Sequence, residues 1–156
     1  QGLWPSGRGD NFLDGGAPYY GTFETSDSLW IALGPIEQPF WLELIEKLEL
    51  HDPIMDQRMD RTYWPQVRQQ IADVIASQTR AHWTNFFEGS DACFAPVLSM
   101  DEAPDYPANS ARGVFQDIDG IVQPAPAPRF DGKAPVAPKT DMSPKAFEAV
   151  LARWGG

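Results

Sequence analysis

The sequence is poor in basic residues and in cysteine. Its 12 Lys and Arg residues face 22 Asp and Glu, and the net charge of -10 argues against a nucleic-acid-binding or anionic-membrane surface. Cys93 is the single cysteine, so the chain can form no internal disulfide, and a reducing compartment such as the cytoplasm is expected. No apolar run approaches the length of a membrane span.

The motifs that mark common catalytic sites are also missing. His51 and His82 are the only histidines, and neither has a Cys or a second His at ligand spacing, which argues against a zinc site. The sequence has no Gly-rich phosphate-binding loop and no Gly-x-Ser-x-Gly nucleophile motif. Cys93 lies in an apolar run and is expected to be a buried, unreactive thiol. From its residues alone, the chain therefore lacks a complete acid–base or nucleophilic site.

What the chain does have is enough apolar material for a core and a mixed pattern of strands and helices. A hydrophobic content of 42%, with six Trp and nine Phe, suits one domain, or one domain plus an arm. Apolar residues recur at helical spacing, and turn residues separate the periodic segments. The pattern predicts an α+β fold. Its first part has an extended linker at 1–18, a β-hairpin at 19–33, helices at about 38–48, at about 64–77 and after Thr79, and a strand at 93–98. Its second part has a short helix from Ser99, a turn at 109–113, a hairpin at 114–122, an extended Pro-rich stretch at 123–138, and a last helix from Ser143 to Gly155.

Two segments hold the residues with the most functional promise. Residues 11–20 read NFLDGGAPYY, in which Asp14, Gly15 and Gly16 are a turn signal. Residues 34–40 read GPIEQPF and place Glu37 at a strand-to-helix junction. From the pattern alone, Glu37 is better explained as an acid favoured by the dipole of the first helical turn than as a catalytic group.

These two segments, in this order and at this separation, resemble the α-methylacyl-CoA racemases, which belong to the family III CoA-transferase superfamily. Two further stretches match, residues 90–97 (SDACFAPV) and, more weakly, residues 126–130 (PAPRF). The resemblance runs from about Gly9 to Trp154, and it implies a larger N-terminal part that is absent from this sequence, which begins with Gln. We therefore expect a C-terminal portion with a linker at 1–18, a small α+β domain at 19–110, and a return segment at 111–156 that packs on the large domain.

The resemblance implies an isomerase that inverts the carbon next to the thioester carbonyl of a 2-methylacyl-CoA. One group removes the α-proton and another returns a proton to the opposite face, through an enolate-like intermediate. The two proton carriers of the family, a His and an Asp, lie in its N-terminal part, and no residue here matches them. No cofactor is implied, since the acyl-CoA thioester is the substrate.

The resemblance also assigns candidate site residues. Glu37 matches the family's active-site glutamate, which is expected to orient the catalytic His and tune its protonation. The other matches are positions that line the acyl pocket and the turn that brings this lining into place: Leu13, Tyr20 and Ile36, and Asp14, Gly15 and Gly16.

The chain departs from the family pattern at two places. The usual Glu-Pro-Gln-Phe is replaced by Glu37-Gln38-Pro39-Phe40, so we expect a slight shift of the helix start while Glu37 itself is kept. Ser28 stands where the branch usually has the Gly of an Asp-Gly turn, which leaves the type of hairpin turn open.

Two other functions stay open. A family III CoA transferase would use a carboxylate nucleophile, also in the missing part, but residues 14–20 and Glu37 favour the racemase branch. An acidic interaction module without enzymatic activity would fit a chain that lacks a complete site. The resemblance further implies an interlocked homodimer, or association with the missing N-terminal part, and the isolated chain is expected to be inactive.

Overall fold

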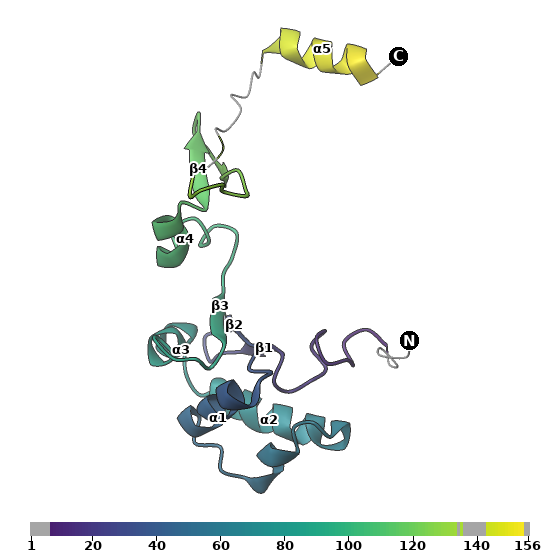
Figure 1. Cartoon of the computed structure of the whole chain (residues 1–156), viewed down its shortest axis with the longest axis vertical. Coiled ribbons are helices and arrows are strands. Elements are labelled where there is room, and N and C mark those ends of the chain that lie inside the picture. Colours follow the sequence, from purple (N-terminus) through teal and green to yellow (C-terminus); the bar gives the residue numbers. More distant parts are fainter. Residues whose placement is uncertain (1–6, 134, 136–142, 155–156) are drawn as a thin grey trace. The chain divides into compact units, whose positions relative to one another are not determined.

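The computed structural model describes residues 7–133, 135 and 143–154 (Figure 1). The chain divides into two compact units, Gln1–Leu98 and Ser99–Gly156, here called the N-terminal and C-terminal units. Their boundary falls earlier than the end of the small domain that the sequence predicted at residue 110. The assignment of residues 111–156 as a segment that packs on a large domain stays a prediction.

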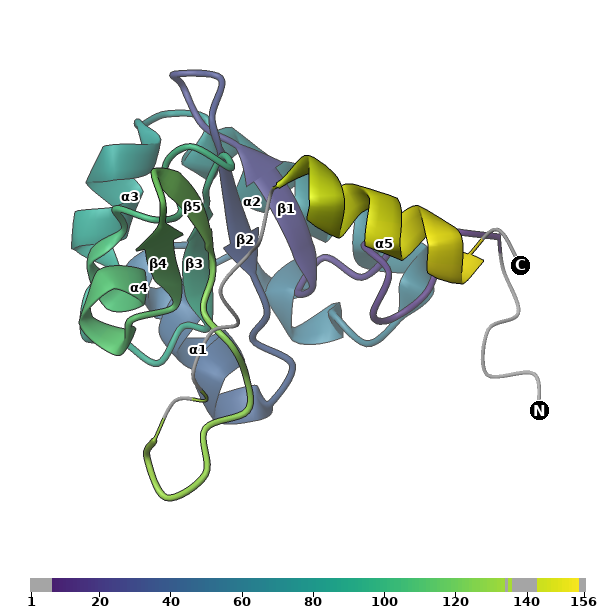
Figure 2. The same ribbon diagram turned by 90° about the horizontal axis from the view of Figure 1, so that it is seen from above.

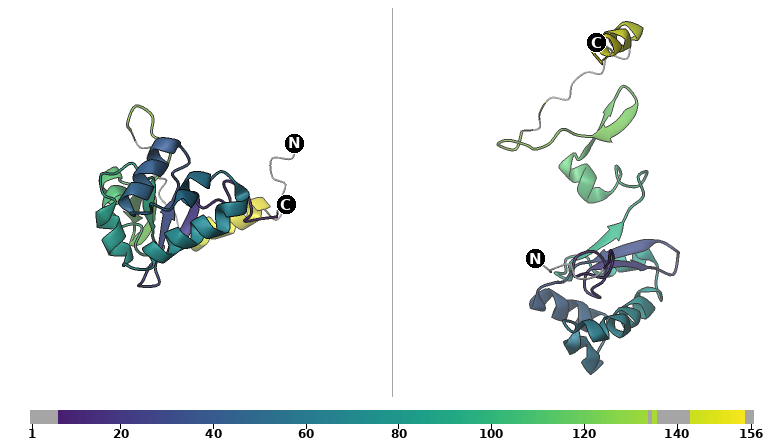
Figure 3. Two further views of the ribbon diagram at one scale, coloured as in Figure 1. Left: turned by 90° about the horizontal axis from the view of Figure 1, so that it is seen from below. Right: turned by 90° about the vertical axis from the view of Figure 1, so that its right-hand side faces the viewer.

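The N-terminal unit is built on a three-stranded antiparallel sheet in the order β1 (Gly21–Glu24), β2 (Trp30–Leu33) and β3 (Phe94–Val97) (Figure 2). On one face Phe23, Ile31 and Leu33 are buried, whereas Trp30 on the opposite face is 43% exposed. This alternation is that of a sheet with one face on the core. The helices α1 (Gln38–Lys47) and α2 (Trp64–Ile75) lie on one side of the strands (Figures 1 and 3).

The helices predicted from periodicity are confirmed. Trp41 and Leu44 are the buried residues of α1, and Val67, Ile71 and Ile75 of α2 are fully buried. These positions recur at three and four residues, so each helix turns one apolar face to the core. The third helix, α3 (Arg80–Phe86), begins after Thr79 as expected, since Thr79 Oγ1 accepts a hydrogen bond from the His82 N–H at 3.1 Å. Two short 3₁₀ helices, η1 (Pro53–Gln57) and η2 (Arg61–Tyr63), connect α1 with α2.

In the turn between β1 and β2, Ser28 takes the backbone conformation that glycine would favour. Its φ is +58°, the left-handed conformation that glycine adopts without strain. The Thr25 hydroxyl donates to Asp27 at 2.5 Å, and the Thr25 N–H donates to the Leu29 carbonyl at 2.8 Å. These bonds close the loop, so the hairpin is kept although the turn carries a side chain at a position that favours glycine.

Residues 7–18 differ from the extended linker that the sequence predicted. They form consecutive turns, and Asn11 and Ala17 are buried, with 3% and 0% of their surface exposed. Tyr19, which follows, is 1% exposed and packs edge-on against Trp41 and Trp64. The richness in Gly and Pro that suggested a linker here serves tight turns on the core surface.

The C-terminal unit contains α4 (Pro107–Arg112), a two-stranded sheet of β4 (Phe115–Ile118) and β5 (Ile121–Pro124), and α5 (Pro144–Trp154). The predicted hairpin is confirmed, and its two turn residues, Asp119 and Gly120, have φ of +54° and +83°. The predicted cap of the last helix is also present, since Ser143 Oγ accepts from the Ala146 N–H at 3.2 Å. The predicted end at Gly155, and residues 136–138 of the Pro-rich stretch, lie outside the described residues.

Two predictions for the C-terminal unit are wrong. Ser99 and Glu102 exchange the bonds of a capping box, at 2.8 and 3.2 Å, but only turns follow. Pro104 explains the difference, because it has no N–H for a helix that would start at Ser99. The helix is α4 instead, where a turn was predicted at 109–113. Pro107 suits its first turn, and Gly113, with φ of +56°, ends it in the left-handed conformation.

Two leucines of α1 test this arrangement of the core. Leu44 is 0% exposed, whereas Leu42 of the same helix is 52% exposed. We expect Leu44→Ala to lower the free energy of unfolding by about 2–5 kcal/mol, because it removes apolar contacts and leaves a cavity. Leu42→Ala is the matched control and should change it by about 0.5 kcal/mol or less. Urea unfolding followed by Trp fluorescence measures both, and equal effects would contradict the packing of α1.

Candidate functional site

One end of the N-terminal sheet gathers residues from three distant parts of the sequence. Gly21 of β1 pairs with Leu33 of β2, and Leu33 pairs with Phe94 of β3. The residues before β1, after β2 and before β3 therefore leave the sheet at the same end. A hydrogen bond from the Gly34 N–H to the Cys93 carbonyl at 3.0 Å extends this pairing beyond the strands.

Tyr20 and Ile36 make this end of the sheet partly apolar. They are 38% and 39% exposed, respectively. The Tyr20 ring lies 3.7 Å from the position that a Cβ on Gly34 would take, so the ring rests directly beside the Gly34 backbone. Both residues are therefore partly open to solvent at this end of the sheet.

Glu37 occupies the N-cap position of α1, with an extended backbone at φ −71° and ψ 146°. Its carbonyl accepts the N–H of Trp41 at 3.0 Å and so begins the helix. Its side chain is exposed and makes no capping hydrogen bond. Capping of free N–H groups therefore does not explain the acid at this position, whereas the favourable dipole at the helix start remains.

Cys93 differs from the buried thiol that the sequence predicted, since it is exposed. Its φ of +51° takes it out of the regular strand path just before β3. Partial desolvation and the negative charges of Glu37, Asp91 and Glu43 raise the pKa of the thiol. The raised pKa favours the protonated thiol at neutral pH.

The turn that contains Asp14 is held by a compact set of hydrogen bonds. The Asp14 carboxylate accepts from the Gly9 N–H at 2.9 Å, from the Asn11 N–H at 2.6 Å, and from the Asn11 side chain at 2.7 Å. These bonds, the one from the Asn11 side chain first among them, lower the pKa of Asp14. An ionised Asp14 therefore closes the turn, and Gly16 then lies against the backbone of Asp10.

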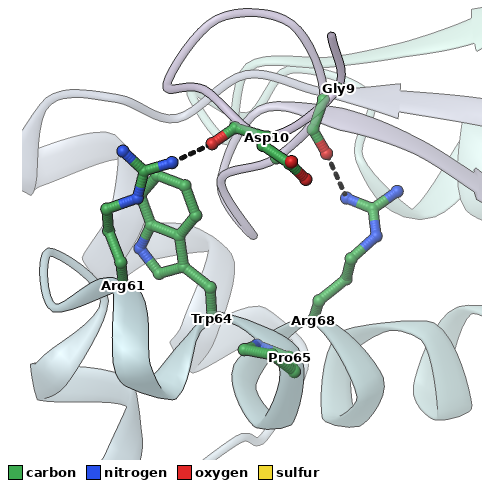
Figure 4. A pocket seen from close by; sticks show the side chains of 8 residues that line it. Gly9, Asp10, Arg61, Trp64, Pro65 and Arg68 are labelled. Carbon is green, nitrogen blue, oxygen red and sulfur yellow. Dashed lines mark hydrogen bonds between the residues drawn. The ribbon is translucent and has the colours of Figure 1, made fainter. Parts of the chain in front are cut away.

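Two arginines fasten this turn to α2 and η2 (Figure 4). Arg61 donates to the Asp10 carbonyl, and Arg68 donates to the carbonyls of Gly15, at 3.3 Å, and Thr22, at 3.0 Å. Each guanidinium also stacks on a ring, Arg61 over Trp64 and Arg68 over Phe23. Between them lies an open hollow of about 450 Å³, lined by Gly9, Asp10, Gly15, Gly16, Arg61, Trp64, Pro65 and Arg68.

The described residues also bear on a metal site, on a role for His82 and on a membrane-spanning helix. Across residues 7–133, 135 and 143–154, no group of three or more His, Cys, Asp or Glu could hold a metal ion. His82 packs in the aromatic surface of α3, stacked on Phe86 with ring centroids 5.9 Å apart. In the described part of the chain, no helix is both long and apolar enough to cross a membrane.

Comparison with known proteins identifies the family. The family model of CoA-transferase family III matches residues 5–146. The chain belongs to CoA-transferase family III. Two similar proteins are named α-methylacyl-CoA racemase: one from Mus musculus is 38% identical over 152 residues, which are 97% of this chain and 40% of that protein, and one from Homo sapiens is 41% identical over 127 residues, which are 81% and 33%. A CaiB/baiF CoA-transferase family protein from Caenorhabditis elegans is 27% identical over 117 residues, which are 75% and 33%.

These matches confirm the resemblance that the sequence motifs indicated. They also show that the chain spans 40% or less of the length of these relatives. What the complete protein does is therefore a matter for proposal.

Within this family III chain, the structure brings Tyr20, Ile36 and Glu37 to the same end of the sheet. Leu13 is 52% exposed and lies in the turn segment, which is placed by its own contacts with Asn11, Arg61 and Arg68. The functional roles of all these residues, and of Asp14, Gly15 and Gly16, stay predictions.

Sequence reasoning left the arginines unplaced and misjudged Cys93. The sequence did hold a sign that arginines contact aromatic rings. Between Lys47 and Lys133 the chain uses only Arg and no Lys, in a stretch rich in aromatic residues. Arginine is preferred over lysine where a cation stacks on a ring and donates several hydrogen bonds at once. No sequence signal marks the positive φ of Cys93, which follows from the way β3 joins the sheet.

Gly16 tests whether the turn is fixed as described. A Cβ on Gly16 would lie 2.5 Å from the Asp10 carbonyl carbon and 2.7 Å from the Asn11 nitrogen, so the backbone would have to move. We expect Gly16→Ala to lower the free energy of unfolding by about 1–3 kcal/mol through overpacking. Gly7→Ala is the control, since its nearest neighbour would be Asp10 Oδ2 at 3.9 Å, and it should change little. Urea midpoints compare the two, and a Gly16→Ala variant as stable as Gly7→Ala would contradict the close approach.

Proposed function

We propose that this chain is the C-terminal part of an isomerase that epimerises 2-methylacyl-CoA thioesters. The observation that carries the proposal is the Glu37 carboxylate, exposed and without a capping role, at the sheet end that also presents Tyr20 and Ile36. It is supported by identities of 38% and 41% to two proteins named α-methylacyl-CoA racemase.

The reaction needs groups on both faces of the substrate carbon. A base takes the α-proton, the electron pair moves onto the thioester oxygen as an enolate, and an acid on the opposite face returns a proton to the carbon. Positioned donors stabilise the developing oxyanion. The family resemblance places the two proton carriers, a His and an Asp, in an N-terminal part. Glu37 would then accept a hydrogen bond from the His, fix its tautomer and stabilise its protonated form.

The other predicted residues have roles that their positions support. Tyr20, Ile36 and Leu13 expose apolar surface that an acyl chain would cover. The turn of Asp14, Gly15 and Gly16 would hold Leu13 in place. No cofactor is proposed, because a thioester already acidifies its α-carbon, and a location in the cytoplasm stays a prediction.

Two alternatives remain to be tested. A CoA transferase of the same family would transfer the CoA through a carboxylate nucleophile in the N-terminal part, and the Caenorhabditis elegans relative bears a CoA-transferase family name. The higher identity to the two proteins named racemase favours the isomerase. A non-catalytic acidic interaction module is favoured only by the incomplete site, and it would give no α-proton exchange with any N-terminal part present.

The role of Glu37 is tested in the protein encoded by the complete reading frame. We expect Glu37→Gln to lower kcat for α-proton exchange in D₂O by about tenfold or more, because each pKa unit of lost imidazolium stabilisation corresponds to about 1.4 kcal/mol. The melting temperature should hardly change, since Glu37 is exposed and caps no N–H group. The present chain alone should give only background exchange, because it contains neither proton carrier.

Glu46→Gln is the matched control, an exposed acid of the same helix, and should leave kcat unchanged. A Glu37→Gln variant that melts at a much lower temperature but keeps its specific activity would show that Glu37 is structural. Exchange by the present chain alone would contradict the assignment of the proton carriers to the N-terminal part.

The C-terminal unit supports the proposal that this chain associates with more protein. None of its described residues is buried, so within the described part it has no core of its own. On α5 the exposed Phe147, Val150, Leu151 and Trp154 follow one another at helical spacing and form one apolar face. Such a stripe marks an interface, which we propose is with a second copy in an interlocked homodimer or with the N-terminal part.

Association is tested by sedimentation of the complete protein at several concentrations. Leu151→Glu places a charge in the stripe and should weaken self-association, because an unpaired charge would be buried in the interface. Ala152→Glu adds the same charge on the opposite side of α5 and serves as the control. A complete protein that is monomeric at every concentration would contradict the homodimer and leave packing on the N-terminal part. Two variants that behave alike in self-association and in melting temperature would contradict any interface on this face.

A further inference from the structure

Arg58 is a buried cation at the centre of the N-terminal unit. It follows η1, and only 6% of its surface is exposed. Its guanidinium carbon lies 5.0 Å from the centroid of the Tyr19 ring and 5.3 Å from that of Trp41. Burial lowers the pKa of Arg58, but a guanidinium still carries its charge at neutral pH. Two ring faces therefore compensate for part of the water that this cation has lost.

The hydrogen bonds of Arg58 are few for a buried guanidinium. Nη2 donates to Gln38 Oε1 at 3.0 Å, whereas Nη1 is buried and has no partner among the described residues. The backbone is fixed separately, because the Trp64 indole N–H donates to the Arg58 carbonyl at 2.8 Å. The bond to Gln38 thus carries much of the polar compensation of this charge, and it is strong because its donor is charged.

The partners of Arg58 are the sequence neighbours of two candidate site residues. Gln38 directly follows Glu37, and Tyr19 directly precedes Tyr20. A single side chain from the η1–η2 connection thus contacts the start of α1 and the segment that enters β1. The family's usual proline at position 38 would offer no side-chain acceptor, so Gln38 adds a hydrogen bond at the first turn of α1 to the contact that Arg58 already makes with Trp41.

We propose that Arg58 is a positioning residue, which fixes the orientation of Glu37 through Gln38 and that of Tyr20 through Tyr19. This rests on the proposed function, since it assumes that both residues meet the substrate or the catalytic His. Because the buried cation strongly favours its bond to Gln38, the first turn of α1 keeps one position, and Glu37 starts from a fixed backbone. Because replacing a buried charge also changes stability, the role is tested by a readout that stability alone does not move.

The experiment uses the complete protein and three variants. Arg58→Met keeps an apolar chain between the two rings but removes the charge and the hydrogen bond. Gln38→Met removes only the acceptor, at an exposed residue, and leaves the guanidinium over the Tyr19 and Trp41 rings. Arg80→Met is the control, because Arg80 donates to the Val97 carbonyl at 2.6 Å, at the other end of the same sheet.

We expect Arg58→Met and Gln38→Met each to lower kcat for α-proton exchange by about tenfold, and the double variant to be no worse than Arg58→Met alone, since both act through one bond. The pH profile of kcat should shift in the same direction as in Glu37→Gln, which lost stability alone would not cause. Arg80→Met should keep kcat and the profile. A Gln38→Met variant with the kcat and pH profile of the wild type, while Glu37→Gln is impaired, would overturn the proposal.

Crystal structures separate failure of this inference from failure of the proposed function. If Glu37→Gln and the wild type exchange equally, the proposed role of Glu37 is wrong, and positioning is then judged from structure alone. Displacement of the first turn of α1 in Gln38→Met would support the coupling. An unmoved Glu37 backbone in Gln38→Met would overturn it.

Discussion

The pairing of Leu33 with Gly21 on one side and Phe94 on the other determines where the candidate functional residues of this chain lie. These pairs set the antiparallel register of the whole sheet, because each strand has only four residues. A shift of one residue would turn Ile31 and Leu33 from the core to solvent. The buried positions therefore fix the register, and the register brings Tyr20, Glu37 and Cys93 to one end.

Arginine side chains that lie over aromatic rings attach the turns of residues 7–18 to the core of the N-terminal unit. Residues 7–18 bury Ala17 and Pro18 and pack Phe12 edge-on against Trp64, but most of the segment is polar backbone and turn residues. Arg61 and Arg68 supply further contacts, because each reaches backbone carbonyls of the segment or of the following strand while its guanidinium lies over a ring. Arg58 differs by being buried, and its position between two rings ties the same segment to α1.

Much of the fold could be predicted from the sequence, since helices with one apolar face and capped ends reveal themselves locally. Residues such as Leu44 and Ile71 recur with the period of a helix, and Thr79 and Ser143 cap as expected. The predictions were wrong where two nearby signals conflict. After Ser99, a capping box favours a helix, but Pro104 opposes it. Nothing in the sequence indicated that Asn11, Ala17 and Tyr19 are buried, because this segment is fastened by arginines about fifty residues away in the sequence.

The candidate site divides in the same way. The family resemblance named Glu37, Tyr20 and Ile36. It could not predict that the register of the strands places them at the same end of the sheet. Arg58 could not be found from sequence, because a lone arginine between 3₁₀ helices gives no sign that it is buried. Its partner Gln38 occurs just where the chain departs from the family pattern Glu-Pro-Gln-Phe.

That departure has a physical logic. A proline after Glu37 would restrict the Glu37 backbone to extended conformations through its ring, so the family pattern fixes the glutamate locally. In this chain the proline stands one residue later, and Glu37 nevertheless keeps φ −71° and ψ 146°, the conformation that a following proline enforces. The constraint that the ring would have supplied is here available from the bond between Arg58 and Gln38. The bond from Arg58 to Gln38 ties the first turn of α1 to the η1–η2 connection, and the contact of Arg58 with Tyr19 extends this tie to the segment that enters β1.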